Sequence, residues 1–223
     1  MSTDRTPGLR YPGGRRAGWA MAAYLVGYLA TFALTVGRLD KLLAATTVEL
    51  EEGTADLASV LASAELSLPT WKGAGWLFYN AHLVPAQVPA PGPQAAVNPN
   101  VVAGADGIVV GLLALPPVLL AGAGWMVTRG ATDSTRLWFD FGVSGRRYAI
   151  NGALVTMLGY LPLSILGTLA FGIGGLNSVG PDQYYGLVVA GAIYPLVFGG
   201  IGGYLGRPAD PTADEPPAEE RMY

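Results

Sequence analysis

The feature that most constrains this chain is an apolar run from Tyr184 to Gly206 that contains no charged side chain. A helix rises about 1.5 Å per residue and needs about 20 apolar residues to cross the hydrocarbon core of a bilayer, which is about 30 Å thick. A helix at the surface of a soluble domain would keep one polar face over this length. The run therefore predicts a transmembrane helix.

The composition agrees with an integral membrane protein that has modest loops. The chain is 51% hydrophobic and 13% charged, with a mean hydropathy of +0.38, whereas soluble domains are about 25% charged. It contains no cysteine, which excludes disulfides, thiolate metal sites and cysteine nucleophiles. Lys41 and Lys72 are its only lysines, and its acids cluster in loops and in the C-terminal tail. This balance is typical of halophilic proteins.

The fold class that follows is all-α, a polytopic membrane protein with four transmembrane helices and an outer helical segment that includes an interfacial helix. Apolar stretches predict the spans at about 17–36, 105–128, 148–173 and 184–206. This membrane domain, 17–206, follows a basic N-terminus, 1–16, that we expect to be disordered. The acidic, proline-rich tail, 207–223, cannot bury enough apolar area to fold.

The start of the chain allows a second interpretation. Arg15 and Arg16 precede the first apolar run, and a twin arginine in this position also begins some export signals. The apolar region of a signal peptide is about 7–15 residues long, and no clear small-residue cleavage site follows this run. A first transmembrane span is therefore the favoured interpretation.

Small residues predict how the spans pack. Gly199, Gly202, Gly203 and Gly206 follow the spacing i, i+3, i+4 and i+7, so they line one face of the last span. In lipid, such a face lets the backbone of another helix approach closely. A similar stripe that includes Gly27 runs along the first span. We expect the two stripes to meet.

Prolines lie near the middle of three predicted spans, at Pro116 and Pro117, at Pro162 and at Pro195. Proline removes a hydrogen bond from the helix, and in lipid the freed carbonyl needs another partner. These positions predict kinks.

The outer segment, 37–100, begins with a predicted helical hairpin. Residues 38–52 and 54–66 each place apolar side chains on one helical face. Thr46 and Glu49 have the spacing of a capping box. The first half of the segment is therefore expected to be two short helices.

Residues 71–84 are rich in aromatic side chains but too few to span a bilayer. Trp76, Tyr79 and Leu83 share one helical face, which predicts an interfacial helix lying on the membrane surface. The prolines of residues 85–100 predict an extended connection to the second span.

Basic residues predict the orientation in the membrane. Ten of the Lys and Arg residues lie in 1–16, in 129–147 and after Gly206, whereas three lie in the segment 37–100. Loops on the cytoplasmic side carry an excess of positive charge. We therefore expect a multi-pass protein of the plasma membrane with both termini in the cytoplasm.

Two ionisable residues are candidates for a functional role. His82 is the only histidine, and a role in ligand binding or pH sensing is one interpretation. Without a second histidine or a cysteine it completes no metal site, so a structural hydrogen bond is the favoured interpretation. Asp106 lies near the start of the second span, where an acid is either functional or, as we favour, a helix cap.

No motif in the chain points to an enzyme. The sequence contains no nucleophile elbow and no phosphate loop after a strand, so we expect no enzymatic activity, cofactor, metal or nucleic acid. The first hypothesis is a scaffold or interaction protein. Its expected partners are the lipid bilayer and either another membrane protein or further copies of the chain.

The alternative is a small transporter or channel subunit that acts as an oligomer, and a third interpretation is a sensor with a ligand-binding outer segment. Kinked helices with freed carbonyls line many transport sites. Transport predicts a polar cavity, whereas a scaffold predicts that the same groups are bonded to neighbours. The residues that distinguish the two hypotheses are Thr156, Tyr160, Ser164, Thr168 and Tyr194.

The stretch from Trp71 to His82, WKGAGWLFYNAH, follows one predicted span and precedes three. In this it resembles a group of uncharacterised haloarchaeal membrane proteins, some of which carry a transporter label. The resemblance implies a haloarchaeal plasma-membrane protein of unknown function. No catalytic or substrate residue comes with it.

Overall fold

The structure is a computed structural model that describes residues 13–51, 53–89, 96–129, 144–174 and 179–207. Most of the N-terminus and tail that we expected to be disordered lies outside these residues. Residues 13–16, also expected to be irregular, instead form the first turn of a helix.

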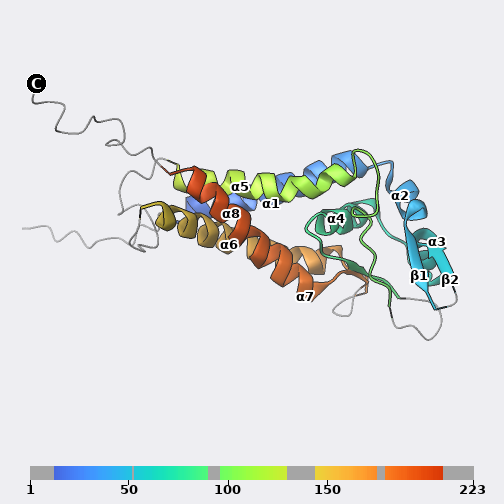
Figure 1. The fold of residues 1–223 in the computed structure, drawn as a ribbon. Coiled ribbons are helices and arrows are strands. Elements are labelled where there is room, and N and C mark those ends of the chain that lie inside the picture. The colour runs from blue at the N-terminus through green and yellow to red at the C-terminus, as the bar shows by residue number, and fades with distance from the viewer. Residues whose placement is uncertain (1–12, 52, 90–95, 130–143, 175–178, 208–223) are drawn as a thin grey trace, which may run out of the picture.

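Helices dominate the described part of the chain (Figure 1). In chain order its elements are α1 (Gly13–Thr35), α2 (Leu39–Ala45), β1 (Thr47–Leu50), β2 (Gly53–Asp56), α3 (Leu57–Ser63), α4 (Thr70–Asn80), β3 (Ala86–Gln87), the 3₁₀ turn η1 (Val110–Ala114), α5 (Leu115–Thr128), α6 (Ser144–Phe171), β4 (Gly180–Pro181), α7 (Gln183–Tyr185), the π-helical segment η3 (Gly186–Ile193) and α8 (Tyr194–Leu205).

Four of the described helical stretches are long and apolar enough to cross a membrane. They are Arg16–Thr35, Val110–Thr128, Gly145–Phe171 and Gln183–Leu205. The second begins later than the predicted residue 105, because turns occupy the positions before it. Large apolar side chains cover the outside of the bundle, among them Leu29, Val118 and Leu166, which are 60%, 66% and 60% exposed. Such a surface suits contact with lipid.

The bundle has two different ends. The pair α1 and α5 separates from α6 and α7 toward one end, where α2, α3 and the β1–β2 hairpin lie (Figure 1). We call this the hairpin end. At the other end, the terminal end, α1 begins, α8 finishes and the helices lie close together.

The glycine face of α8 closes the terminal end. A Cβ atom at Gly202 would overlap the backbone of Ala121 in α5, and one at Gly203 would lie 2.7 Å from the Cα of Gly152 in α6. The predicted meeting of this face with the first span is therefore wrong. Gly27 instead packs against Phe78 of α4 and a leucine of α5.

The prolines predicted to kink the spans occupy different kinds of position in the helices. Pro116 and Pro117 lie in the first turn of α5, where a missing N–H group leaves no hydrogen bond unmade. Pro162 lies inside α6. Pro195 follows the π-helical segment, in which the N–H of Tyr194 reaches back five residues to the carbonyl of Val189.

The predicted helical hairpin is only partly helical. The first helix ends at Ala45, and β1 and β2 then form an antiparallel hairpin in which Thr47 pairs with Asp56. Gly53 adopts a φ of +136°, which suits the chain reversal there. Asp56 caps α3 by accepting a hydrogen bond from the N–H of Ser59, and the hydroxyl and N–H of Ser59 lower the pKa of this carboxyl group.

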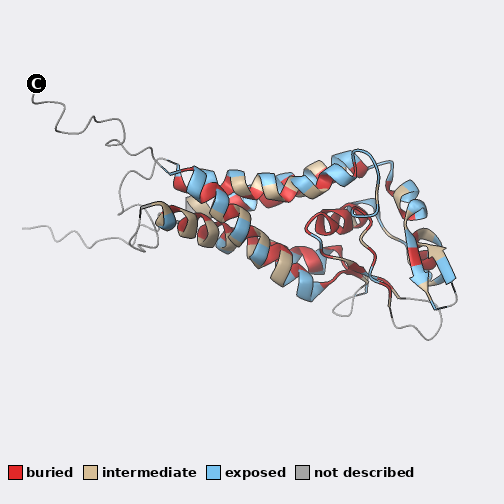
Figure 2. Ribbon diagram, viewed as in Figure 1, coloured by how far each residue is buried: buried red, intermediate tan, exposed pale blue. Residues whose placement is uncertain are grey.

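The prediction of an interfacial helix at residues 71–84 is wrong in its placement. Residues 73–80 of α4 are all buried, and Trp76 and Tyr79 are 2% and 0% exposed. The helix lies between α1 and α6 at the hairpin end (Figures 1 and 2). Its aromatic rings therefore contact other helices rather than lipid headgroups.

Candidate functional site

Small residues let the first half of α4 enter the bundle. Gly73 lies directly against the side chain of Leu39, and Gly75 lies directly against the ring of Phe171. Two donors of α4 then bind backbone carbonyls where α6 ends. Lys72 Nζ lies 2.5 Å from the oxygen of Gly172, and Trp76 Nε1 lies 3.0 Å from that of Phe171. These bonds fix the first half of α4 at the hairpin end.

The second half of α4 reaches the middle of the bundle. Its side chains, and that of His82 in the turn after it, contact residues near the middle of three of the four spans. These residues are Tyr24, Tyr160 and Tyr194. The tip of this segment is therefore about half-way along the spans.

After the turn at His82 the chain returns to the hairpin end. Residues Ala86–Gln87 of β3 pair with Gly180–Pro181 of β4, which follows α6, and Val88 pairs with Val97. Asp182 joins the same region, because its N–H donates to the oxygen of Pro85. In relation to the four spans, α4 is thus a re-entrant helix. Backbone of this kind at membrane depth is tolerated where protein surrounds it.

His82 is fully buried at the tip of the re-entrant segment. Its Nδ1 lies 2.8 Å from the carbonyl oxygen of Phe78, and its Nε2 lies 2.7 Å from the hydroxyl of Tyr160. Since a carbonyl only accepts, Nδ1 carries the proton and donates it. The Nε2 of the neutral ring then accepts from Tyr160.

The environment of His82 favours this neutral form. The imidazole ring packs edge-to-face against the ring of Phe78, with ring centres 4.8 Å apart, and its centre lies 5.2 Å from that of the Tyr194 ring. Burial among these rings removes the hydration that a charged imidazole needs, and it lowers the pKa of His82 from 6.5 to about 4. The site therefore contains an imidazole that is neutral at pH 7 and has both nitrogens bonded.

A second chain of hydrogen bonds lies beside the histidine. The hydroxyl of Tyr79 donates to the carbonyl of Ser164 at 2.5 Å, so the hydroxyl of Tyr24, 3.1 Å away, donates to Tyr79. Ser164 in turn donates its own hydroxyl to the carbonyl of Gly186 at 2.9 Å. This chain connects α1, α4, α6 and the start of η3. Gly167 makes room for it, because a Cβ there would overlap both phenol groups.

Asn80 shapes the turn at the tip. Its side-chain nitrogen donates to the oxygen of Val84 at 2.8 Å, and its side-chain oxygen accepts from the N–H of Val101 at 2.8 Å. Leu83 has a φ of +61° and is 54% exposed, although its neighbours in the turn are buried. These contacts satisfy the polar groups of a turn that lies deep in the bundle.

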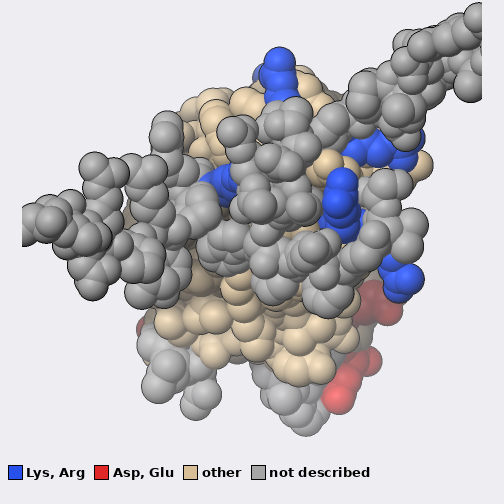
Figure 3. Space-filling view, turned by 90° about the vertical axis from the view of Figure 1, so that its left-hand side faces the viewer, with Lys and Arg blue, Asp and Glu red and all other residues tan. Residues whose placement is uncertain are grey.

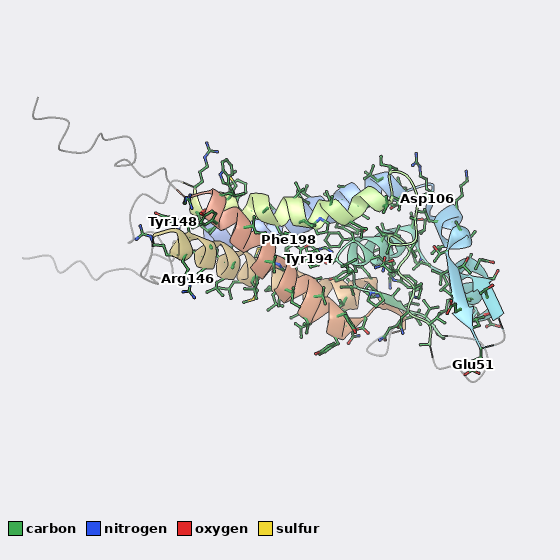
Figure 4. The ribbon with its side chains drawn as sticks, in the orientation of Figure 1. Glu51, Asp106, Arg146, Tyr148, Tyr194 and Phe198 are labelled. Carbon is green, nitrogen blue, oxygen red and sulfur yellow. The ribbon has the colours of Figure 1, made fainter. Side chains whose placement is uncertain are left out.

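The structure brings some of the candidate residues together and leaves others apart. His82, Tyr160 and Tyr194 form one cluster, with Tyr194 beside Phe198 near the middle of the bundle (Figure 4). Asp106 is exposed in the loop at the hairpin end and caps no helix, since the helix start at Val109 has no side-chain cap. Asp106 is therefore separate from this cluster.

The glycines of α8 have a packing role and do not reach the cluster. Gly199, Gly202, Gly203 and Gly206 lie against α5 and α6 toward the terminal end. Within the described residues, no group of three or more His, Cys, Asp or Glu side chains could hold a metal ion.

Sequence reasoning missed Tyr24, although it donates to the second hydrogen-bond chain. In the sequence Tyr24 is one aromatic residue inside an apolar span and is 55 positions from its partner Tyr79. No local pattern indicates a contact of that range. The clue that the sequence does offer is the concentration of polar and aromatic residues in the stretch that forms α4.

Comparison with known proteins places most of the chain in one family. A family model matches residues 2–209. The chain belongs to the family of unknown function DUF7978. No curated protein and no solved structure matches it. For this DUF7978 protein, the buried cluster around His82 is thus the site from which a function must be argued.

Proposed function

We propose that this protein is a four-span protein of the cell membrane that acts without enzymatic activity, as a scaffold or interaction partner of another membrane protein or of its own copies. The observation that supports this most is how the polar groups between the spans are used. Tyr160 bonds to His82, Ser164 donates to Gly186, and Thr168 donates to the carbonyl of Ile165 at 2.8 Å. Side chains that line a transport path would need to exchange such bonds for a substrate.

The proposal includes an orientation and a source. The excess of basic residues at the termini and in the loop 129–147 favours a cytoplasmic position for both termini in the plasma membrane. The hairpin end would then lie outside the cell. The low lysine content and the likeness of residues 71–82 to haloarchaeal membrane proteins favour a halophilic origin.

Transport remains a second candidate because of one specific observation. His82 is an ionisable residue half-way along the spans, on a re-entrant helix, and such residues often belong to ion or proton paths. Thr156 also has a buried hydroxyl that lacks a hydrogen-bond partner. In this candidate function the histidine would bind and release a proton.

One experiment separates the two candidates. The purified protein is reconstituted in liposomes with a pH-sensitive dye inside, and a potassium diffusion potential drives proton entry. If the protein is a scaffold, the proton flux should equal that of protein-free liposomes for the wild type and for both variants, His82→Gln and Glu49→Gln. Glu49 lies in the exposed hairpin, so Glu49→Gln serves as the control. Flux that disappears in His82→Gln but persists in Glu49→Gln would overturn the scaffold proposal and establish the transporter.

Assembly is measured separately, by light scattering in detergent with correction for bound detergent, at high and low salt. A scaffold that acts through its own copies gives an oligomer that survives low salt. One that acts through another protein gives a monomer and a stoichiometric complex after co-expression with that protein. A monomer that gains no partner in cross-linked native membranes would contradict the proposal.

The orientation has a direct test because the chain contains no cysteine. Thr54→Cys places a thiol on the exposed hairpin, and Thr212→Cys places one in the C-terminal tail. A membrane-impermeant maleimide should label the first in intact cells and the second only after permeabilisation. The reverse pattern would invert the proposed topology.

A further inference from the structure

Charge is separated along the bundle. The described acidic residues lie in the outer segment, in the loop before α5 and beside α7, all toward the hairpin end. They are Asp40, Glu49, Glu51, Asp56, Glu65, Asp106 and Asp182. The described side chains of the terminal end include arginines and no acid. Figure 3 looks onto this end and shows basic side chains at several places around it.

Three of these arginines share one arrangement, in which the guanidinium lies over an aromatic ring of its own helix end. The distance from the guanidinium carbon to the ring centre is 4.5 Å for Arg129 and Trp125, 5.1 Å for Arg147 and Tyr148, and 4.1 Å for Arg207 and Tyr204. Stacking positions a guanidinium and leaves its in-plane N–H groups available to an anion.

The three helix ends that carry these arginines are neighbours. A Cβ at Gly206 would lie 2.7 Å from the carbonyl oxygen of Trp125, so α8 finishes against the last turn of α5. A Cβ at Gly145 would lie 3.6 Å from an Nη atom of Arg207, which places that arginine beside the start of α6. Arg207 therefore lies at a junction with both other helices.

These guanidinium groups lack anionic partners among the described residues. No salt bridge joins Arg129, Arg147 or Arg207 to a described carboxylate. The Nε of Arg147 is buried without a hydrogen-bond partner, and its Nη2 makes one contact, at 3.5 Å, with the hydroxyl of Tyr148. Among the described residues, the Nη groups of Arg147 thus make only this one long contact, which leaves them available to a phosphate oxygen.

The surroundings suit a lipid more than a soluble anion. Trp125 and Tyr204 are 37% and 45% exposed, in the position where aromatic rings mark the boundary between headgroups and acyl chains. Ile201, about one turn before Tyr204 in α8, is 48% exposed, and Leu205, next to Tyr204, is 65% exposed, so both offer an apolar surface for acyl chains. A ligand with an anionic head and an apolar tail matches both parts.

We propose that Arg129, Arg147 and Arg207 form an arginine site that binds the phosphate of an anionic phospholipid. The guanidinium groups receive the phosphate oxygens, and the aromatic rings hold those groups at headgroup depth. The proposal does not depend on whether the protein is a scaffold or a transporter. It requires only that the four spans cross a bilayer.

Native mass spectrometry of the delipidated full chain in detergent tests this site, with phosphatidylglycerol and phosphatidylcholine added in separate titrations. The wild type should bind phosphatidylglycerol more tightly. A basic residue near an anionic headgroup contributes roughly fivefold in affinity, so the variant with Arg129, Arg147 and Arg207 all changed to Gln should bind roughly 100-fold more weakly. Arg38→Gln, an exposed arginine at the hairpin end, should bind like the wild type.

Three results would overturn the proposal. They are equal binding of the two lipids, unchanged phosphatidylglycerol binding by the triple variant, and an equal loss in Arg38→Gln. If the triple variant fails to fold, Arg207→Gln alone should lose roughly fivefold, and an unchanged affinity would count against the site. Inorganic phosphate should not displace the lipid at equal concentration, and displacement would assign the site to a free anion.

Discussion

The helices of the bundle are packed in different ways in its terminal half and in its hairpin half. Toward the terminal end, α8 meets α5 and α6 through glycines, and the nearest neighbours of Gly202 and Gly203 are backbone atoms. Toward the hairpin end the spans separate, and α4 fills the space with large rings such as those of Trp76, Phe78 and Tyr79. The terminal half is therefore packed through backbone contacts at glycines, whereas the hairpin half is filled by the side chains of α4.

This difference bears on where the protein can change. Backbone contacts leave no side chain that can rotate away, so we expect the terminal half to be the less adaptable of the two. The hairpin half contains hydroxyls, an imidazole and rings whose bonds can be exchanged. Any response to pH or to a partner is therefore expected around α4.

The largest effect is expected for Gly202→Ala in the terminal half. The added methyl group would overlap the backbone of Ala121, so α5 and α8 must separate, at a cost above about 3 kcal/mol. Gly200→Ala is the matched control, because its Cβ would lie 3.5 Å from its neighbours. Thermal unfolding in detergent measures both. Equal melting temperatures for the two variants would refute the account of the terminal half.

Lowering the pH should affect stability through the hairpin half. Folded His82 has a pKa lowered from 6.5 to about 4, so between these values the unfolded chain binds a proton that the folded chain does not. The contribution of His82 to the free energy of unfolding is then complete well above pH 6.5 and falls as the pH is lowered through 6.5 toward 4, by about 2 kcal/mol at pH 5. The groups that face the imidazole are phenols, those of Tyr79, Tyr160 and Tyr194, which stay uncharged in this range.

His82→Gln is the control for this pH dependence. It removes the titrating group and keeps a neutral side chain that donates and accepts, so its stability should change less between pH 8 and pH 5. Unfolding curves at several pH values measure the difference. Parallel curves for the variant and the wild type would assign the pH dependence to surface carboxylates instead.

Two Tyr→Phe substitutions, each of which removes one hydroxyl group, compare the hydrogen bonds of the hairpin half. Tyr160→Phe leaves the buried Nε2 of His82 without a donor and should cost about 1.5 kcal/mol. Tyr24→Phe should cost less, because the hydroxyl of Tyr79 still donates to Ser164. Unfolding free energies of the two variants give the order. If Tyr24→Phe proves the more damaging, the two chains of bonds have been ranked wrongly.

The sequence predicted the two halves unequally well. The spans follow from apolar length, a property of consecutive residues, and the glycine face of the last span follows from helical spacing. The helices that pack against this glycine face could not be predicted, because the spacing identifies a face of the helix but does not show which other helix covers it. The β1–β2 hairpin was missed because Leu and Val positions fit a helix, although Thr46, Thr47 and Val48 are β-branched and Gly53 suits a turn.

The position of α4 was beyond sequence reasoning for a physical reason. An aromatic, short amphipathic stretch suits both a membrane surface and a cleft between helices. The contacts that select the cleft join residues far apart in the chain, such as Lys72 with Gly172 and His82 with Tyr160. His82 could be singled out as the only histidine, but its depth and its two partners could not be predicted.

The smallest effect is expected for Gly27→Ala in the hairpin half. Its Cβ would lie 2.8 Å from the ring of Phe78 and 3.2 Å from a methyl group of Leu119, and both neighbours are side chains. A ring and a methyl group can move by a few tenths of an ångström, so we expect a loss of about 1 kcal/mol, well below that of Gly202→Ala. The same unfolding assay decides. If Gly27→Ala is as damaging as Gly202→Ala, α4 is packed as rigidly as the glycine contacts, and the hairpin half is no more adaptable than the terminal half.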